Sequence, residues 1–235
     1  MGTRPLADVP RPVWALFAVA LAAQLAWRAP AGTPDDAPMR PVSVPLLRLA
    51  SLGEPVALAK ALMLYVQGAE GQRSFQQLDY NVLAGWLDAA VDLDARGQYP
   101  LMLASEVYAA TSDRARSRRM LDFVHARFAD DPDRRWPWLA HAALAAKHRL
   151  HDLPLARRYA HDIRTRTTPG HIPPWAQQLE VFVLDEMNET ESERVLIGAM
   201  IASGQVTDPR ELAFLAKRLA QLPHPGVRPK ARRAG

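Results

Sequence analysis

The chain has 235 residues, of which 49% are hydrophobic and 23% charged, with 20 Pro, 12 Gly and no Cys. This hydrophobic fraction argues against disorder over the full length, and the length is sufficient for one substantial buried core. The absence of cysteine excludes disulfide bonds, thiolate metal ligands, a cysteine nucleophile and a lipidated cysteine. Lysine is scarce while arginine and alanine are abundant, which is typical of GC-rich bacterial genes.

The basic character of the chain is concentrated at its C-terminus. The formal net charge is +4 and the pI is near 9.7. Residues 228–235 carry four basic side chains and no acid, so the remaining chain is formally neutral. The high pI therefore indicates a basic tail, which we expect to be disordered over residues 223–235, and does not predict a DNA-binding domain.

Residues 13–27 form an uncharged apolar stretch with Trp14 and Trp27 near its ends. As a helix these 15 residues reach about 22 Å, short of a hydrocarbon core of about 30 Å, although flanking arginines that snorkel lengthen the effective span. Three interpretations are open: a single membrane anchor, a cleaved signal sequence with its cleavage site near Ala29-Pro30-Ala31, and a helix buried in the fold.

We adopt the membrane anchor, preceded by a short N-terminal segment, residues 1–12. The positive-inside rule favours an N-terminus in the cytoplasm, and therefore a single-pass protein of the inner membrane with its body in the periplasm. Residues 28–42 contain four prolines and no helical apolar pattern, which indicates an extended linker between anchor and body.

From about Leu46 onward the apolar residues recur with a helical period and do not alternate as in strands. A short helix is expected to end at residues 51–53, and another to begin at Pro55. Residues 68–77 read as a polar loop. Asp79 is then expected to cap a helix that ends at Leu93.

The sequence after this helix repeats itself at a spacing of 37 residues. Each repeat is expected to open a helix with proline in its first turn, at Tyr99-Pro100, Trp136-Pro137 and Pro173-Pro174. The apolar residues that share one register are Val107, Leu144 and Val181. Each second helix follows a polar turn and carries a small residue, which is Ser117, Ala156 or Ser192 in turn. The second helices are expected to end at Pro132, Pro169 and Gly204.

These features together resemble the tetratricopeptide repeat, with three units over residues 99–206 and a weaker one over 55–94. The spacing of 37 differs from the 34 usual in that family, and its Leu-Gly pair is missing. The resemblance implies an all-α right-handed solenoid of antiparallel helix pairs, here residues 43–222, that binds a protein or peptide on its concave face. It does not imply an enzyme.

A last helix, residues 208–222, would cap this solenoid. Pro209 and Glu211 after Asp208 form a helix start signal. An outward polar face, which terminal repeats need, would come from Glu211, Lys217, Arg218 and Gln221.

Few residue groups point to chemistry. His141, His148 and His151 fall on one helix and its end, but a zinc site would need further ligands that the sequence does not supply. Asp130, Asp131 and Asp133 are explained as caps and turn formers. There is no glycine-rich phosphate loop, nucleophile elbow or nucleotide fingerprint, so we expect no catalytic site, metal or cofactor.

Arginine is dense on the predicted second helices, and tryptophan on the first helices. The arginines form either a solvated helix face or a positive strip for an anionic partner, and they are Arg114, Arg116, Arg118, Arg119, Arg127, Arg157, Arg158, Arg164 and Arg166. Trp136, Trp138 and Trp175 pack at helix joints or anchor a bound peptide.

The sequence thus favours a membrane-anchored scaffold that binds another protein of the bacterial cell envelope. The residues predicted to contact that partner are Arg118, His141, Arg158, Gln177 and Gln178. The alternative is a protein that binds an anionic surface, lipid or nucleic acid, through its arginines and tail. Nucleic acid is disfavoured because no aromatic residues are interleaved with the arginines. The oligomeric state is left open.

Overall fold

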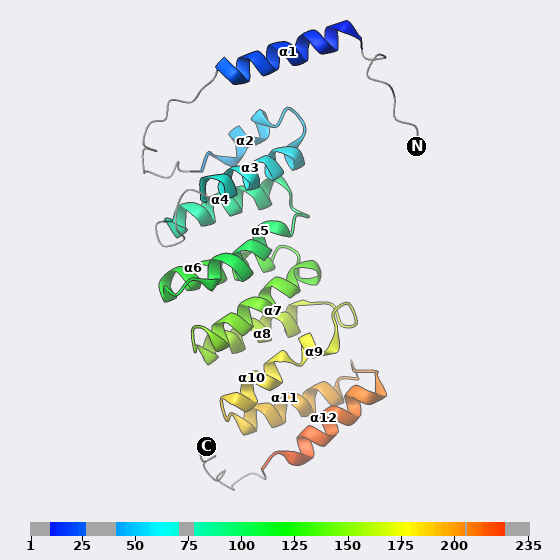
Figure 1. Cartoon of the computed structure of the whole chain (residues 1–235). Coiled ribbons are helices and arrows are strands. Elements are labelled where there is room, and N and C mark those ends of the chain that lie inside the picture. Colours follow the sequence, from blue (N-terminus) through cyan, green and yellow to red (C-terminus); the bar gives the residue numbers. More distant parts are fainter. Residues whose placement is uncertain (1–9, 27–40, 71–77, 205, 224–235) are drawn as a thin grey trace. The chain divides into compact units, whose positions relative to one another are not determined.

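The computed structural model of the chain describes residues 10–26, 41–70, 78–204 and 206–223, and every regular element in these ranges is a helix (Figure 1). The all-α prediction is confirmed. The chain divides into two compact units, Met1–Pro38 and Met39–Gly235, which we describe separately. The predictions for residues 1–9, for residue 27 of the anchor, for linker residues 28–40, for polar-loop residues 71–77 and for tail residues 224–235 lie outside the described residues.

The described part of the first unit is the helix α1 (Arg11–Ala26) and the residue before it. Its described side chains, residues 12–23, are all exposed, and the rings of Trp14 and Phe17 contact each other edge to face. Taken singly, none of the described helices has both the length and the apolar character to cross a membrane; α1 contributes a shorter apolar segment, Pro12–Ala23. Val44–Ala50 and Pro55–Gly68 pass that test only as a pair, bent by 111°.

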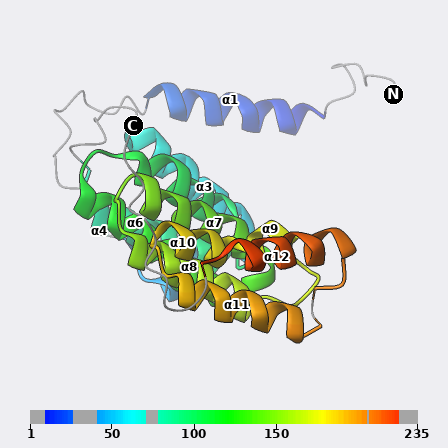
Figure 2. The ribbon, with the colours of Figure 1, turned by 90° about the horizontal axis from the view of Figure 1, so that it is seen from below.

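The second unit, which we call the body, consists of consecutive helices (Figures 1 and 2). Its α-helices are α2 (Val44–Ala50), α3 (Pro55–Glu70), α4 (Tyr80–Leu93), α5 (Tyr99–Met102), α6 (Arg114–Phe128), α7 (Pro132–His148), α8 (Leu153–Arg166), α9 (Pro174–Gln177), α10 (Leu179–Glu186), α11 (Thr190–Ala202) and α12 (Pro209–Gln221). A π-helix, η3 (Leu103–Val107), and a 3-10 turn, η4 (Tyr108–Ala110), continue α5.

Aspartates begin four of these helices, and two of them, Asp79 and Asp208, were predicted as helix starts. The side chains of Asp79, Asp113, Asp152 and Asp208 each accept at least one backbone N–H of the first turn, which otherwise has no partner within the helix. The predicted helix from Asp79 to Leu93 is therefore confirmed as α4. The predicted last helix is confirmed as α12.

The helices pack on one another in the order of the chain. We call α3, α5 with η3, α7, α9 with α10, and α12 the first helices, and α4, α6, α8 and α11 the second helices. Each first helix before α12 packs on the second helix that follows it, and each second helix packs in turn on the next first helix. Ser117 of α6 and Ala156 of α8 are fully buried. Small side chains at these positions allow the neighbouring helices to approach closely.

One predicted helix start is wrong. Trp136-Pro137 does not open a helix, because α7 begins at Pro132 and contains Pro137 in its interior. Pro132 was expected to end the preceding helix, yet it occupies the first turn of α7, where its missing N–H costs no hydrogen bond. The buried guanidinium of Arg135 reinforces this turn, since it donates to the Arg127 carbonyl, to Asp130 and to the Ala95 carbonyl.

A second difference concerns the register of the last repeat. Val107 and Leu144 are partly exposed, but Val181, predicted to match them, is buried and Phe182 is exposed in its place. In this repeat a break at Gln178 separates α9 from α10, and it lies between the helix start and Val181.

One of the four residues predicted to form the outward polar face of α12 does not face outward. Arg218 turns toward the body, where its guanidinium lies 2.6 Å from Glu193 and also pairs with Asp185. Glu193 is buried, so its charge requires a cation from the neighbouring helix.

The N-cap of α6 gives a direct test of these local signals. We expect Asp113→Ala to lower the free energy of unfolding by about 1 kcal/mol, because the N–H groups of Ala115 and Arg116 lose their acceptor. Asp113→Ser should retain most of the stability, since serine is also a good N-cap. Urea denaturation of the two variants measures the difference, and equal losses would contradict the capping role.

Candidate functional site

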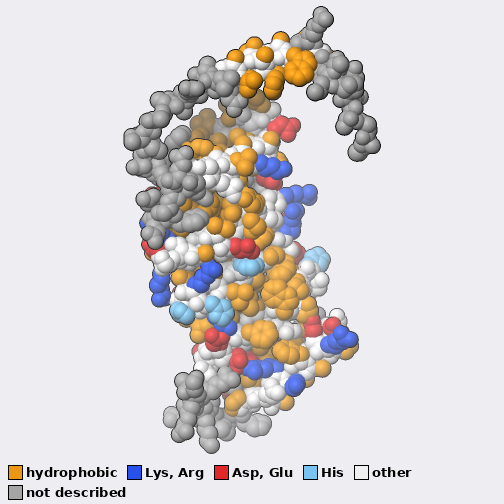
Figure 3. All heavy atoms as spheres, in the orientation of Figure 1, with side chains coloured by type: hydrophobic (Ala, Val, Ile, Leu, Met, Phe, Trp, Pro, Cys, Tyr) orange, Lys and Arg blue, Asp and Glu red, His pale blue; other side chains and the backbone are white. Residues whose placement is uncertain are grey.

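Large hydrophobic side chains remain exposed on every first helix of the body. We call this set the first-helix stripe, and its members are Leu64, Tyr99, Val107, Leu144, Trp175, Phe182 and Phe214. In the view of Figure 3, hydrophobic side chains gather along the middle of the body over these helices. Exposed apolar surface that continues over several elements is typical of an interaction site.

Ring contacts connect successive first helices at two places, each involving a stripe residue. Trp136 of α7 meets Trp175 of α9 edge to face, with ring centroids 5.5 Å apart. Phe182 of α10 and Phe214 of α12 lie 6.1 Å apart. Leu64 and Tyr99 line the same pocket. Aromatic pairs of this kind are rigid, because few side-chain torsions remain to be fixed when a partner binds.

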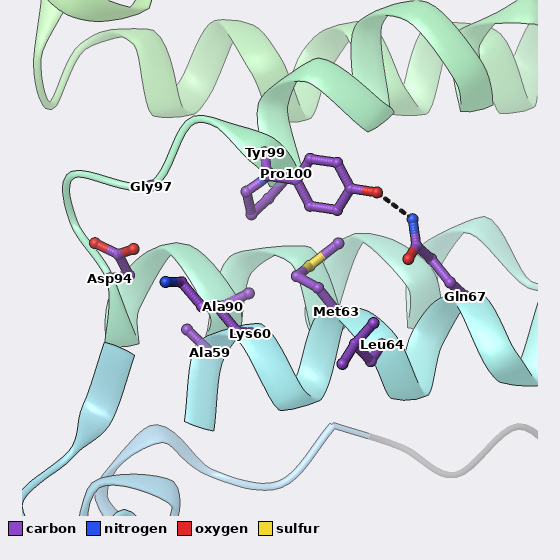
Figure 4. A pocket seen from close by; sticks show the side chains of 10 residues that line it. All are labelled: Ala59, Lys60, Met63, Leu64, Gln67, Ala90, Asp94, Gly97, Tyr99 and Pro100. Carbon is purple, nitrogen blue, oxygen red and sulfur yellow. Dashed lines mark hydrogen bonds between the residues drawn. The ribbon is translucent and has the colours of Figure 1, made fainter. Parts of the chain in front are cut away.

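The pocket lies between α3, the end of α4 and the start of α5, and has a volume of about 460 Å³ (Figure 4). Ala59, Met63 and Ala90 contribute apolar surface, while the Gln67 amide donates a hydrogen bond to the Tyr99 hydroxyl. A smaller pocket of about 320 Å³ at the other end of the stripe is lined by Phe182 and Phe214, among others. Both recesses are large enough for a side chain of a bound protein.

Only one predicted contact residue lies openly on this side of the body. His141 of α7 is exposed, stacks on Trp138, and places its Nε2 3.4 Å from Glu106 of η3. Gln177 is half-buried at the end of α9. Gln178 is buried, with 6% of its surface exposed, so it offers a partner little surface.

The two predicted arginines lie on second helices and differ in their pairing. Arg118 of α6 is partly buried, 3.0 Å from Asp122 and 3.3 Å from Asp152 of the next pair. Arg158 of α8 is exposed and lies over the ring of Tyr159. Within the described residues Arg158 forms no ion pair, so of these two arginines it has the freer charge.

Most of the other arginines also have acidic partners. The side chain of Arg127 donates to Asp88 at 2.7 Å and to Asp92 at 2.8 Å. Burial alone would lower the pKa of Arg127, but these hydrogen bonds and charges outweigh it and raise the pKa above its ordinary value. The predicted positive strip is therefore largely neutralised by carboxylates from neighbouring helices.

The carboxylate of Glu180 lies close to two of these arginines and to a histidine. Glu180 of α10 is buried and lies 2.9 Å from the Arg164 guanidinium and 3.2 Å from Nδ1 of His161. Arg157 approaches it at 3.7 Å. A buried carboxylate is stable only when it is paired in this way, so these side chains hold α8 against α10.

The histidines singled out in the sequence do not converge. His148 and His151 are exposed at the end of α7 and in the turn after it. In the described part of the chain no group of three His, Asp or Glu residues could hold a metal ion.

Comparison with protein-family models, with curated proteins and with solved structures gives no match to this chain.

Only some residues of the first-helix stripe could be predicted from the sequence. Trp175 was a candidate anchor because of its residue type, and the spacing of 37 placed Val107 and Leu144 on one face. The spacing does not say whether that face is buried. Phe182 and Phe214 were missed, because their exposure depends on the break at Gln178 and on how α12 docks.

Two arginines of α8 test whether the cations of the second helices are structural. We expect Arg164→Met to lower the free energy of unfolding by about 2 kcal/mol, because it removes a charged hydrogen bond from buried Glu180. The matched variant Arg158→Met should change it by no more than about 0.5 kcal/mol. Chemical denaturation distinguishes the two, and similar losses would show that Glu180 does not depend on Arg164.

Proposed function

We propose that residues 43–222 form a tetratricopeptide-like helical solenoid that binds another protein of the bacterial cell envelope. In this proposal residues 13–27 anchor the chain in the inner membrane and the body lies in the periplasm. No catalytic role and no cofactor are assigned.

The first-helix stripe is the observation that carries the proposal. The body exposes seven large hydrophobic side chains along one set of helices. Such exposure lowers the solubility of a folded protein unless a partner covers these side chains. In a tetratricopeptide-like solenoid the first helices line the concave face. The stripe then extends over several units, and a rigid scaffold loses little entropy on binding.

The anionic-surface alternative receives less support from the same contacts. Lipid or nucleic acid would require free cations, but Arg118, Arg127 and Arg164 are engaged with carboxylates. His141 keeps its place as a candidate polar contact beside the stripe. Arg158 stays a prediction, although it lies on a second helix.

The anchor is supported by α1 alone. Its described side chains are exposed and, over residues 12–23, uncharged. Trp14 lies near the start of this segment, as expected of an aromatic residue at a membrane interface. We therefore retain the single anchor over the signal sequence.

Site-specific crosslinking in cells tests the partner proposal. A photo-crosslinking amino acid would replace Trp175 or Phe182 in the full chain, with Val195 as the control. Val195 is a large, exposed hydrophobic residue on the second helix α11. We expect one protein adduct, shared by the two stripe positions and resistant to high salt, and no such adduct at Val195.

A substitution then measures the contribution of the stripe. Trp175→Ala should weaken partner capture at Phe182 about tenfold or more, as expected when a central aromatic contact is lost, while Val195→Ala should have no effect. Adducts of equal strength at Val195, or adducts only with lipid or nucleic acid that high salt removes, would contradict the proposal.

A further inference from the structure

The N-terminal end of the body exposes apolar side chains that no described element covers. Leu46 and Leu49 of α2 are 58% and 75% exposed, and Leu52 in the following turn is 92% exposed. Val56, at the start of α3, is also exposed. We call these four residues the N-terminal apolar patch. Figure 1 shows α2 at the end of the body, next to α3 and α4.

The orientation of the patch is fixed by contacts on the other side of α2. Leu47 is buried, and the guanidinium of Arg48 donates to the carbonyl of Asp92 in α4 at 3.2 Å. Just before α2, Pro41 packs so closely on Gly85 that a Cβ there would lie 2.6 Å from the proline ring. These contacts hold α2 in place, so Leu46 and Leu49 cannot turn inward without releasing them.

Leucine is an unfavourable residue at position 52 for two separate reasons, one in the backbone and one in the side chain. Its φ of 50° lies in the left-handed region, which glycine or asparagine occupies at lower cost. Its side chain is also almost fully exposed, whereas a polar residue would suit both the backbone and the solvent. Leu52 thus adds a freely accessible apolar side chain to the patch.

The opposite end of the body is different. The described exposed residues of α12 include Arg210, Lys217 and Gln221, which suit a helix that faces water. In residues 41–60 there is one acid, Glu54, and two bases, Arg48 and Lys60. The N-terminal end is therefore apolar with a slight positive charge, which matches an anionic lipid surface better than it matches water.

We propose that the N-terminal apolar patch inserts into the surface of the lipid bilayer, with Lys60 near the headgroups. This inference rests on the proposed membrane anchor, and it adds a second lipid contact. Residues 27–43 join α1 to α2, and these 17 residues can span at most about 60 Å. A single short anchor gains from such a second contact, because two weak membrane signals on one chain act together.

The absence of cysteine allows a clean test on the full chain. Single variants Leu46→Cys and Leu49→Cys would carry an environment-sensitive fluorophore, in vesicles of phosphatidylcholine and phosphatidylglycerol. Val195→Cys, at a residue that is 69% exposed, is the matched control, and Leu16→Cys reports on α1. Circular dichroism of each labelled chain confirms that it is folded, which these exposed positions should permit.

We expect nitroxide-labelled lipids to quench most of the fluorescence at positions 46 and 49, and aqueous iodide to quench little of it. Position 195 should show the reverse. Equal behaviour of positions 46, 49 and 195 would overturn the inference, and so would protection from iodide without quenching by lipid, which would indicate that a second copy of the chain covers the patch. An aqueous label at position 16 would instead count against the anchor, so the two failures are distinguishable.

Discussion

The body depends on the burial of apolar surface between consecutive helices, since a helix pair with apolar residues on two sides is not stable in water alone. In α7, Ala140, Ala143 and Ala146 are buried, and α8 meets this helix with Ala156 and Ala160. Small side chains allow the helix axes to approach closely, and each pair leaves a further face for the next pair to cover. The hydrogen bonds that join pairs therefore recur at similar separations along the chain: 34 residues for Arg118–Asp152, 37 for His125–Asp162 and 39 for Arg127–Asp88.

This packing determines which side chains are left for a partner. On the second helices the acids and arginines are used to join one pair to the next, and buried Glu180 shows how strongly the fold requires such cations. On the first helices large aromatic and aliphatic residues stay exposed, and the rings of Phe182 and Phe214 contact each other. The chemical contrast between the two sets of helices is therefore a consequence of how the pairs are joined. It leaves the first helices as the apolar, rigid surface of the body.

Local signals were read reliably from the sequence, and signals that depend on packing were not. Asp79 and Asp208 cap helices as predicted, because an N-cap acts on the N–H groups directly after it. Pro137 was misread because a proline early in a helix and one in its interior look alike in sequence. Gln178 and Arg218 were placed at the surface because they are polar, whereas their burial or pairing is decided by residues elsewhere in the chain. Phe182 and Phe214 of the stripe escaped prediction for the same reason, since exposure is a property of the assembled body.

Taken together, the two proposals imply which end of the first-helix stripe lies nearer the membrane. If α2 lies on the lipid surface, the pocket between α3 and α5 is near the bilayer and Phe214 of α12 is farther from it. A partner that contacts the whole stripe would then extend away from the membrane along the first helices. A partner confined to the bilayer would reach only Leu64, Tyr99 and their neighbours. Because Trp175 and Phe182 belong to the later first helices, contacts there favour a partner with a substantial domain outside the membrane.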